Sequence, residues 1–176
     1  MLVTLKPHPK TPGPAIEIAV EVLRPRAEGI DLRFLITGDV SQIVVPERVR
    51  PSRADELWRS TCFEAFIHKD GGGYCELNQS PAGYWAAYEF SGYREGMYAH
   101  PGVEVRDFRR NMEEGALTIG ATFDLDRVMS GQSLPWRIAL SAVIETRVGD
   151  ISYWALAHPS DKPDFHHPDS FILELP

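Results

Sequence analysis

Residues 56–97 read ELWRSTCFEAFIHKDGGGYCELNQSPAGYWAAYEFSGYREGM, and they contain the clearest strand pattern in the chain. Apolar and polar residues alternate on both sides of the triple glycine at 71–73, which predicts two strands joined by a hairpin turn. Acidic residues stand inside both strands, at Glu64 and Glu76, instead of at their ends. A sheet face that mixes charged with aromatic side chains is typical of a ligand-binding surface.

A hairpin loop over residues 69–72 sets the expected pairing of these two strands. Glu64 then faces Leu77 and Glu76 faces Ala65, so the two acids point to opposite sides of the sheet. On this register they do not form the paired acid and base of a glycosidase, which leaves ligand binding or a buried structural role for each.

The same register bears on the two cysteines of the chain. It places Cys62 opposite Gln79 and Cys75 opposite Phe66, which separates the thiols beyond the Cα distance of about 7 Å that a disulfide can span. Reduced, buried thiols are typical of proteins that stay in a reducing compartment, so we expect a cytoplasmic protein.

Strand-like alternation continues along the rest of the chain. The expected strands lie at 2–5, 15–23, 29–38, 43–45, 61–68, 73–79, 84–90, 103–111, 116–124, 134–146, 151–157 and 170–175. Only two single turns of helix are expected, at 52–58 and 124–129. About eleven strands of ordinary length, separated by glycine and proline, predict an all-β fold, an antiparallel β-sandwich of the immunoglobulin-like or jelly-roll-like kind.

The composition fits one globular domain over residues 1–176. A formal net charge of −7 argues against non-specific nucleic-acid binding, which requires a basic surface. A local patch at Arg106, Arg109 and Arg110 is more simply explained as a solvated strand edge. No run approaches ~18 apolar residues, so no membrane span is expected. Prolines interrupt the N-terminal segment where a secretory signal needs an apolar run.

Several motifs give the chain a family resemblance. ELW at 56–58, CFEAFI at 62–67 and YCELNQSPAG at 74–83 resemble the DOMON-like superfamily, which includes the family-9 carbohydrate-binding modules. The resemblance to a bacterial stand-alone subgroup of unassigned function is carried by WAAYEF at 85–90, YREGM at 93–97, YWALAHP at 153–159 and PDFHHPD at 163–169. It implies a β-sandwich that binds a sugar or a haem, and the fold by itself selects neither ligand.

The densest cluster of ionisable residues lies at 158–169 and consists of His158, Asp161, Asp164, His166, His167 and Asp169. Histidine and carboxylate suit zinc, and carboxylates suit calcium, but the spacing matches no standard metal motif. His166 and His167 are adjacent, so in an extended segment only one of them can join a given site. Three hypotheses remain: a structural loop held by its own hydrogen bonds, a ligand-binding loop, and a divalent-metal site.

Arg94 and Trp58 are the other prominent candidates. Arg94, within Tyr93-Arg94-Glu95, can fork onto a carboxylate or a sugar hydroxyl, or pair with a glutamate inside the protein. Trp58 is the aromatic residue expected nearest a binding site, because it precedes a strand in a charged loop, whereas most of Tyr84, Trp85, Trp136 and Trp154 should lie in the core. The predicted ligand-binding residues are Trp58, Glu76, Asn78, Tyr93, Arg94, Glu95, His158, Asp164, His166 and His167.

Three functions are compatible with these features. The first is a binding module for a small polar ligand, with a carbohydrate as the leading candidate, no cofactor and no catalytic activity, because the chain has neither a Gly-x-Ser-x-Gly elbow nor a phosphate-binding glycine loop. The second is an enzyme that acts on a sugar-like substrate with a divalent metal held by residues 158–169. The third is a haem-binding redox module that uses Met97 or Met112 with a histidine. The sequence leaves the oligomeric state open.

Overall fold

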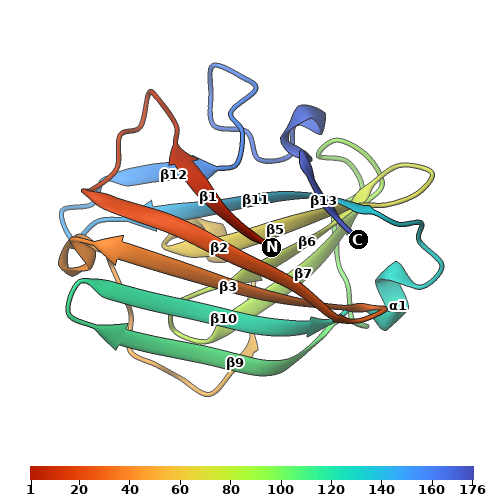
Figure 1. The fold of residues 1–176 in the computed structure, drawn as a ribbon, viewed down its shortest axis with the longest axis horizontal. Coiled ribbons are helices and arrows are strands. Elements are labelled where there is room, and N and C mark those ends of the chain that lie inside the picture. The colour runs from red at the N-terminus through yellow and green to blue at the C-terminus, as the bar shows by residue number, and fades with distance from the viewer.

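The computed structural model describes all residues from 1 to 176, and β-strands dominate it (Figure 1). The strands are β1 (Leu2–Pro7), β2 (Ile16–Arg26), β3 (Gly29–Gly38), β4 (Ser52–Arg53), β5 (Cys62–His68), β6 (Tyr74–Gln79), β7 (Tyr84–Phe90), β8 (Tyr98–Ala99), β9 (Glu104–Glu113), β10 (Ala116–Asp124), β11 (Trp136–Glu145), β12 (Ile151–Ala155) and β13 (Leu173–Leu175). Helical structure is limited to η1 (Val40–Gln42), η2 (Leu57–Arg59), α1 (Asp126–Met129) and η3 (Pro168–Ser170). The predicted all-β class is confirmed.

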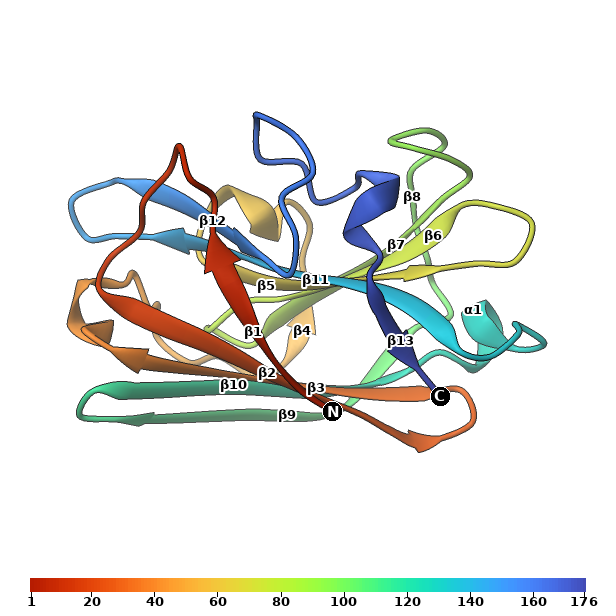
Figure 2. The ribbon, with the colours of Figure 1, turned by 45° about the horizontal axis from the view of Figure 1, so that its top comes forward.

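The strands form one sheet that curls over into two layers. Its order is β4-β7-β6-β5-β11-β12-β1-β2-β3-β10-β9, with β8 added to β7 and β13 added to β11. We call β2, β3, β10 and β9 the front layer, and β7, β6, β5, β11 and β12 with their short neighbours the back layer (Figures 1 and 2). Strand β1 joins them, because its first residues pair with β2 whereas Lys6 and Pro7 pair with β12.

The predicted sandwich of two separate antiparallel sheets is wrong in two respects. The structure has a single sheet of 13 strands, and β4 runs parallel to β7. The strands β4 and β8 contain two residues each, which is too short for alternation to reveal them. The expected strand at 43–45 is reduced to one isolated bridge between Ile43 and Thr146.

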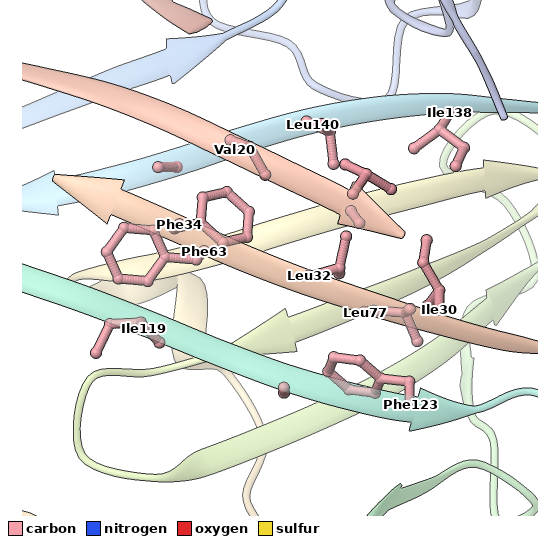
Figure 3. Close-up of a cluster of buried hydrophobic side chains, with 14 of the residues drawn as sticks. Val20, Ile30, Leu32, Phe34, Phe63, Leu77, Ile119, Phe123, Ile138 and Leu140 are labelled. Atoms are coloured by element: carbon pink, nitrogen blue, oxygen red, sulfur yellow. The ribbon is translucent and has the colours of Figure 1, made fainter. Parts of the chain in front are cut away.

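The main hydrophobic core lies between the two layers (Figure 3). Alternate residues of β2 are buried there, as the sequence pattern predicts, and the front-layer ring of Phe34 packs 5.0 Å from the back-layer ring of Phe63 between centroids. Figure 3 shows Leu32, Leu77 and Leu140 converging on the same space from three strands. Burial of this apolar surface, worth about 25 cal/mol per Å², is the main force that holds the curled sheet closed.

The predicted register of the β5–β6 hairpin is wrong by one residue. Glu64 pairs with Asn78, and Phe66 pairs with Glu76. The loop has an odd number of residues centred on Gly71, since the Lys69 N–H donates to the Gly73 carbonyl. Gly71, Gly72 and Gly73 all adopt positive φ angles, which glycine tolerates without a steric penalty. A slip of one residue reverses the face of a side chain, so Glu64 and Glu76 lie on the same side of the sheet.

The cysteines are free and buried. Cys75 pairs with Ile67 and packs in the core, whereas Cys62 shares the opposite sheet face with Glu64. The expected partners of both cysteines are therefore corrected along with the register, and the expectation of buried free thiols is confirmed.

A second, smaller apolar cluster covers the outer face of the back layer. It contains Phe66, Tyr74, Ala86, Tyr88, Phe90, Ala139 and Phe171, with Leu57, Trp58 and Phe165 packed against them. Figure 2 shows the loop after β7 and the segment between β12 and β13 rising above this face. These two segments and η2 enclose the site described below.

Candidate functional site

A cavity of about 360 Å³ opens on the outer face of the back layer. Its floor is formed by Glu64 of β5, Glu76 of β6 and Val143 of β11. The remaining lining residues are Trp58, Phe90, Arg94, Met97, Tyr153, Pro163, Phe165 and His166. The site therefore combines a floor that carries two acids on rigid strands with largely apolar walls contributed by η2, β7, β12 and the loops, the usual composition of a small-molecule site.

The two acids of the floor are almost completely buried, Glu64 with 2% and Glu76 with 4% of its surface exposed. Glu64 Oε2 accepts a hydrogen bond from the Ser141 hydroxyl at 3.0 Å, and Glu76 Oε1 accepts one from Asn78 Nδ2 at 2.8 Å. Burial raises the pKa of Glu76 to about 7, and burial together with the charge of Glu76 raises the pKa of Glu64 to about 8. Near neutral pH the pair consequently retains a proton.

His166 is held beside this pair as a neutral imidazole. The Tyr74 hydroxyl lies 2.6 Å from His166 Nδ1 and accepts the Arg94 backbone N–H at 3.2 Å. We assign the hydroxyl proton to Nδ1, the acceptor within hydrogen-bonding distance of it, which places the ring hydrogen on Nε2, 4.0 Å from Glu76 Oε2. Burial lowers the pKa of His166 to about 4, with the charge of Arg94 acting in the same direction.

Asp164 ties together the two loops over the cavity. It accepts a hydrogen bond from the Tyr93 hydroxyl at 2.5 Å and one from the Arg94 guanidinium at 2.8 Å. Burial raises the pKa of Asp164, but the hydrogen bonds from Tyr93 and Arg94 outweigh it and hold that pKa below its usual value. Arg94 has a φ of 57°, a left-handed conformation rare outside glycine. The expected internal partner of Arg94, a glutamate, is replaced by this aspartate.

Trp58 reaches the cavity from η2. Its ring meets Tyr88 edge-on at 5.6 Å between centroids, and the Tyr88 hydroxyl donates to Asp55 at 2.8 Å. Because Trp136 and Trp154 are buried in the core instead, Trp58 is the tryptophan that a ligand in the cavity can contact.

No protein-family model matches the chain, and no curated protein matches its sequence. Its structure is similar to that of a candidate carbohydrate-binding protein from Bacteroides uniformis, with a TM-score of 0.69 and 12% identity over 97% of this chain and 84% of that chain. It is also similar to a family-9 carbohydrate-binding module from Caldicellulosiruptor kristjanssonii in complex with glucose, with a TM-score of 0.47 and 8% identity over 89% of this chain and 76% of that one. The likeness to the first of these shows that the two chains share a fold.

Most of the predicted ligand-binding residues gather at this cavity. Trp58, Glu76, Arg94 and His166 line it, Asn78 and Asp164 are hydrogen-bonded to the lining residues Glu76 and Arg94, and Tyr93 donates to Asp164. Asn78 is completely buried, and its Oδ1 has no hydrogen-bond partner. An unpaired buried acceptor is uncommon, and this one lies behind Glu76, to which the Asn78 amide donates.

Three predicted residues lie away from the cavity. His158 Nε2 is 2.8 Å from the Lys6 carbonyl, and its ring packs edge-on against His8. His167 caps η3, since its Nδ1 accepts the Asp169 N–H at 3.2 Å. Glu95 belongs to an exposed turn. No three side chains of the His, Cys, Asp or Glu type are grouped to hold a metal ion.

Several residues of the site escaped sequence analysis. Glu64 was assigned to the wrong sheet face, and a loop centre placed on Gly71 is the signal that would have recovered it. Tyr74, Tyr153 and Phe165 lie within the motifs that carry the family resemblance but were not predicted as ligand-binding residues, because their place at the site depends on how distant segments fold together.

The arginines of the proposed local patch are engaged within the protein. Arg106 binds Asp124 and Arg109 binds Asp31, whereas Arg110 donates to the backbone carbonyls of Pro46 and Pro81. The patch is therefore consistent with a strand edge that is paired internally. None of the helices has the length and apolar character that a membrane span requires.

Proposed function

We propose that this protein is a small-ligand-binding module of the DOMON-like type and that its ligand is a carbohydrate. The observation that carries the proposal is the cavity itself, which is lined by the flat ring of Trp58 together with the buried acids Glu64 and Glu76. A sugar ring presents an apolar face that packs on an aromatic ring and an edge of hydroxyl groups that need hydrogen-bond partners.

The loop residues suit the same ligand. His166 offers an N–H through Nε2, and Arg94 offers the guanidinium hydrogens that Asp164 leaves free. A volume of about 360 Å³ accommodates a small sugar. The name of the Bacteroides uniformis protein, which shares the fold, supports the choice of a carbohydrate.

A metal-assisted enzyme is the less well supported alternative. This alternative places the metal among residues 158–169. His158, His166 and His167 are instead bonded to three different groups, the Lys6 carbonyl, the Tyr74 hydroxyl and the Asp169 N–H, so they do not converge on one metal. The third function, a haem module, would use Met97 and His166 as iron ligands, since both line the cavity. Nδ1 of His166 is hydrogen-bonded to Tyr74, so Nε2 is the nitrogen left for iron.

The proposal is tested by thermal unfolding of the full chain with a panel of mono- and disaccharides. A sugar at 100 times its Kd adds roughly 2.7 kcal/mol to the free energy of unfolding, which raises Tm by about 5–10 °C for a domain of this size. Trp58→Ala and Arg94→Ala should each abolish the shift, and Tyr84→Ala, an aromatic outside the cavity, should preserve it. Sugars that shift wild-type and Trp58→Ala protein equally would contradict the assignment of the site.

A further inference from the structure

The cavity floor contains chemistry that binding alone does not require. Glu64 and Glu76 occupy diagonal positions on paired strands, since Glu64 pairs with Asn78 and Asn78 is two residues from Glu76. Diagonal neighbours on one sheet face are about 7–8 Å apart at their Cα atoms, within the combined reach of two glutamate side chains. Neither carboxylate has a cationic partner in direct contact, and Asn78 Oδ1 beside them is unpaired.

The surroundings distinguish the two acids. Facing the pair are Cys62 and Tyr74 from the strands, Tyr88 from β7, and Arg94, Asp164 and His166 from the loops. Glu76 Oε1 accepts the Asn78 amide at 2.8 Å, its Oε2 lies 4.0 Å from His166 Nε2, and the positive charge of Arg94 favours its carboxylate form. Glu64 accepts a hydrogen bond from the uncharged Ser141 hydroxyl, and the charge of Glu76 favours its protonated form. Glu76 is therefore the base of the pair, and Glu64 keeps the proton.

We infer that Glu64 and Glu76 catalyse the opening and closing of the ring of a reducing sugar bound in the cavity, so that the protein interconverts the α and β anomers. This inference rests on the proposed function, because it requires a sugar in the cavity. The substrate class is an aldose with a free anomeric hydroxyl.

The step balances within the pair. The Glu76 carboxylate removes the proton of the anomeric hydroxyl as the Glu64 carboxyl donates its proton to the ring oxygen. The bond between the anomeric carbon and the ring oxygen breaks, and that carbon becomes an aldehyde. After rotation of the aldehyde group, the ring hydroxyl attacks the carbonyl carbon and both protons return. No water, oxidant or cofactor is consumed.

The arrangement favours this reaction over glycoside hydrolysis. Hydrolases place their two carboxyl groups on either side of the scissile bond. Here both acids rise from one sheet face, so they reach the same edge of a bound ring. Ring opening exchanges protons between two oxygens bonded to one carbon, which an acid and a base on the same side can serve together.

The test follows the anomers of freshly dissolved α-D-glucose, α-D-galactose and α-D-xylose by polarimetry and NMR, with and without the full-length protein. We expect the wild-type protein to accelerate equilibration of at least one sugar. Glu64→Gln and Glu76→Gln should each reduce the acceleration by about 100-fold or more, which is the usual contribution of a general acid or base. Glu17→Gln, on the exposed face of β2, is the matched control and should equilibrate the sugar at the wild-type rate.

Thermal shift with the same sugars is measured on the same samples. A sugar that stabilises the wild-type protein but equilibrates at the uncatalysed rate overturns this inference and leaves the proposed function intact. A complete lack of stabilisation and acceleration overturns both. Acceleration that persists in both glutamine variants overturns the assignment to these residues. The wild-type protein alone shows whether a sugar is bound and whether its equilibration is accelerated. The test therefore still decides the inference if one of the variants does not fold.

Discussion

Glu64 and Glu76 extend from neighbouring strands into the same cavity, and each is more than nine-tenths buried. Two acids placed together away from water are unfavourable, because each charged form loses hydration and repels the other. Apolar residues at these positions would pack without that penalty. Polar groups that reduce stability in this way are concentrated at functional sites, so the two acids mark the cavity as the candidate functional site of the protein.

The buried acids predict a stability that falls as the pH rises. Because the pKa of Glu64 is raised to about 8 and that of Glu76 to about 7, the folded protein binds protons that the unfolded chain has released above about pH 4.5. The free energy of unfolding should therefore decrease between pH 5 and pH 8, by up to roughly 1.4 kcal/mol per pH unit for each proton concerned. Urea denaturation at pH 5, 7 and 9 measures this slope.

Glu64→Gln should flatten that slope, because glutamine keeps the shape of the acid without its charge. Glu17→Gln should leave it unchanged. A stability that increases from pH 5 to pH 9 would contradict the predicted burial of the acids. The opposite sign applies at low pH, where Asp124, whose pKa is lowered by Arg26 and Arg106, contributes stability that is lost on acidification.

Both cysteines should be unreactive in the folded protein. Burial raises the pKa of Cys62 and of Cys75, so little thiolate forms and reagents cannot reach it. With a chromogenic disulfide reagent at pH 8, we expect no reaction in native buffer and two thiols in denaturant. Rapid labelling of one thiol in native protein would show that the back layer opens.

The alternation of β2 was enough to predict that strand and its buried face, since one face meets the core along its whole length. The sheet face on which Glu64 and Glu76 lie could not be predicted in the same way, because it depends on which residue is at the centre of the glycine loop. The contact from Tyr93 to Asp164 joins loops far apart in the sequence and follows from tertiary packing alone. Sequence patterns therefore identified the strands and many of the site residues, whereas their geometry required the structure.

Truncation of Phe63 should reduce the stability of the protein more than any of the other substitutions. Its side chain is fully buried and packs against Phe34 between the layers (Figure 3). Phe63→Ala removes apolar contact and leaves a cavity, so we expect a loss of about 3–5 kcal/mol in the free energy of unfolding. Val148→Ala, at a side chain that is 84% exposed, should change it by less than about 0.5 kcal/mol. Similar effects of the two substitutions in urea denaturation would argue against the two-layer core.

The last prediction concerns Asp164, which connects Tyr93 and Arg94 across the cavity. Asp164→Asn removes the charge that pairs with Arg94 while it keeps the size of the side chain. The guanidinium of Arg94 is half exposed, so the loss of folding stability should stay below about 1 kcal/mol. Sugar binding should nevertheless weaken about tenfold, equivalent to about 1.4 kcal/mol, because the ligand must then order both loops.

The matched control is Asp161→Asn, in the same loop, whose carboxylate is almost fully exposed and lies 3.5 Å from Lys10. Titration calorimetry with the sugar that gives the largest thermal shift compares the two variants. Because the control removes the same charge without touching the cavity, equal weakening in both would assign the effect to the net charge of the loop. Weakening confined to Asp164→Asn would establish that the connection between the loops organises the binding site.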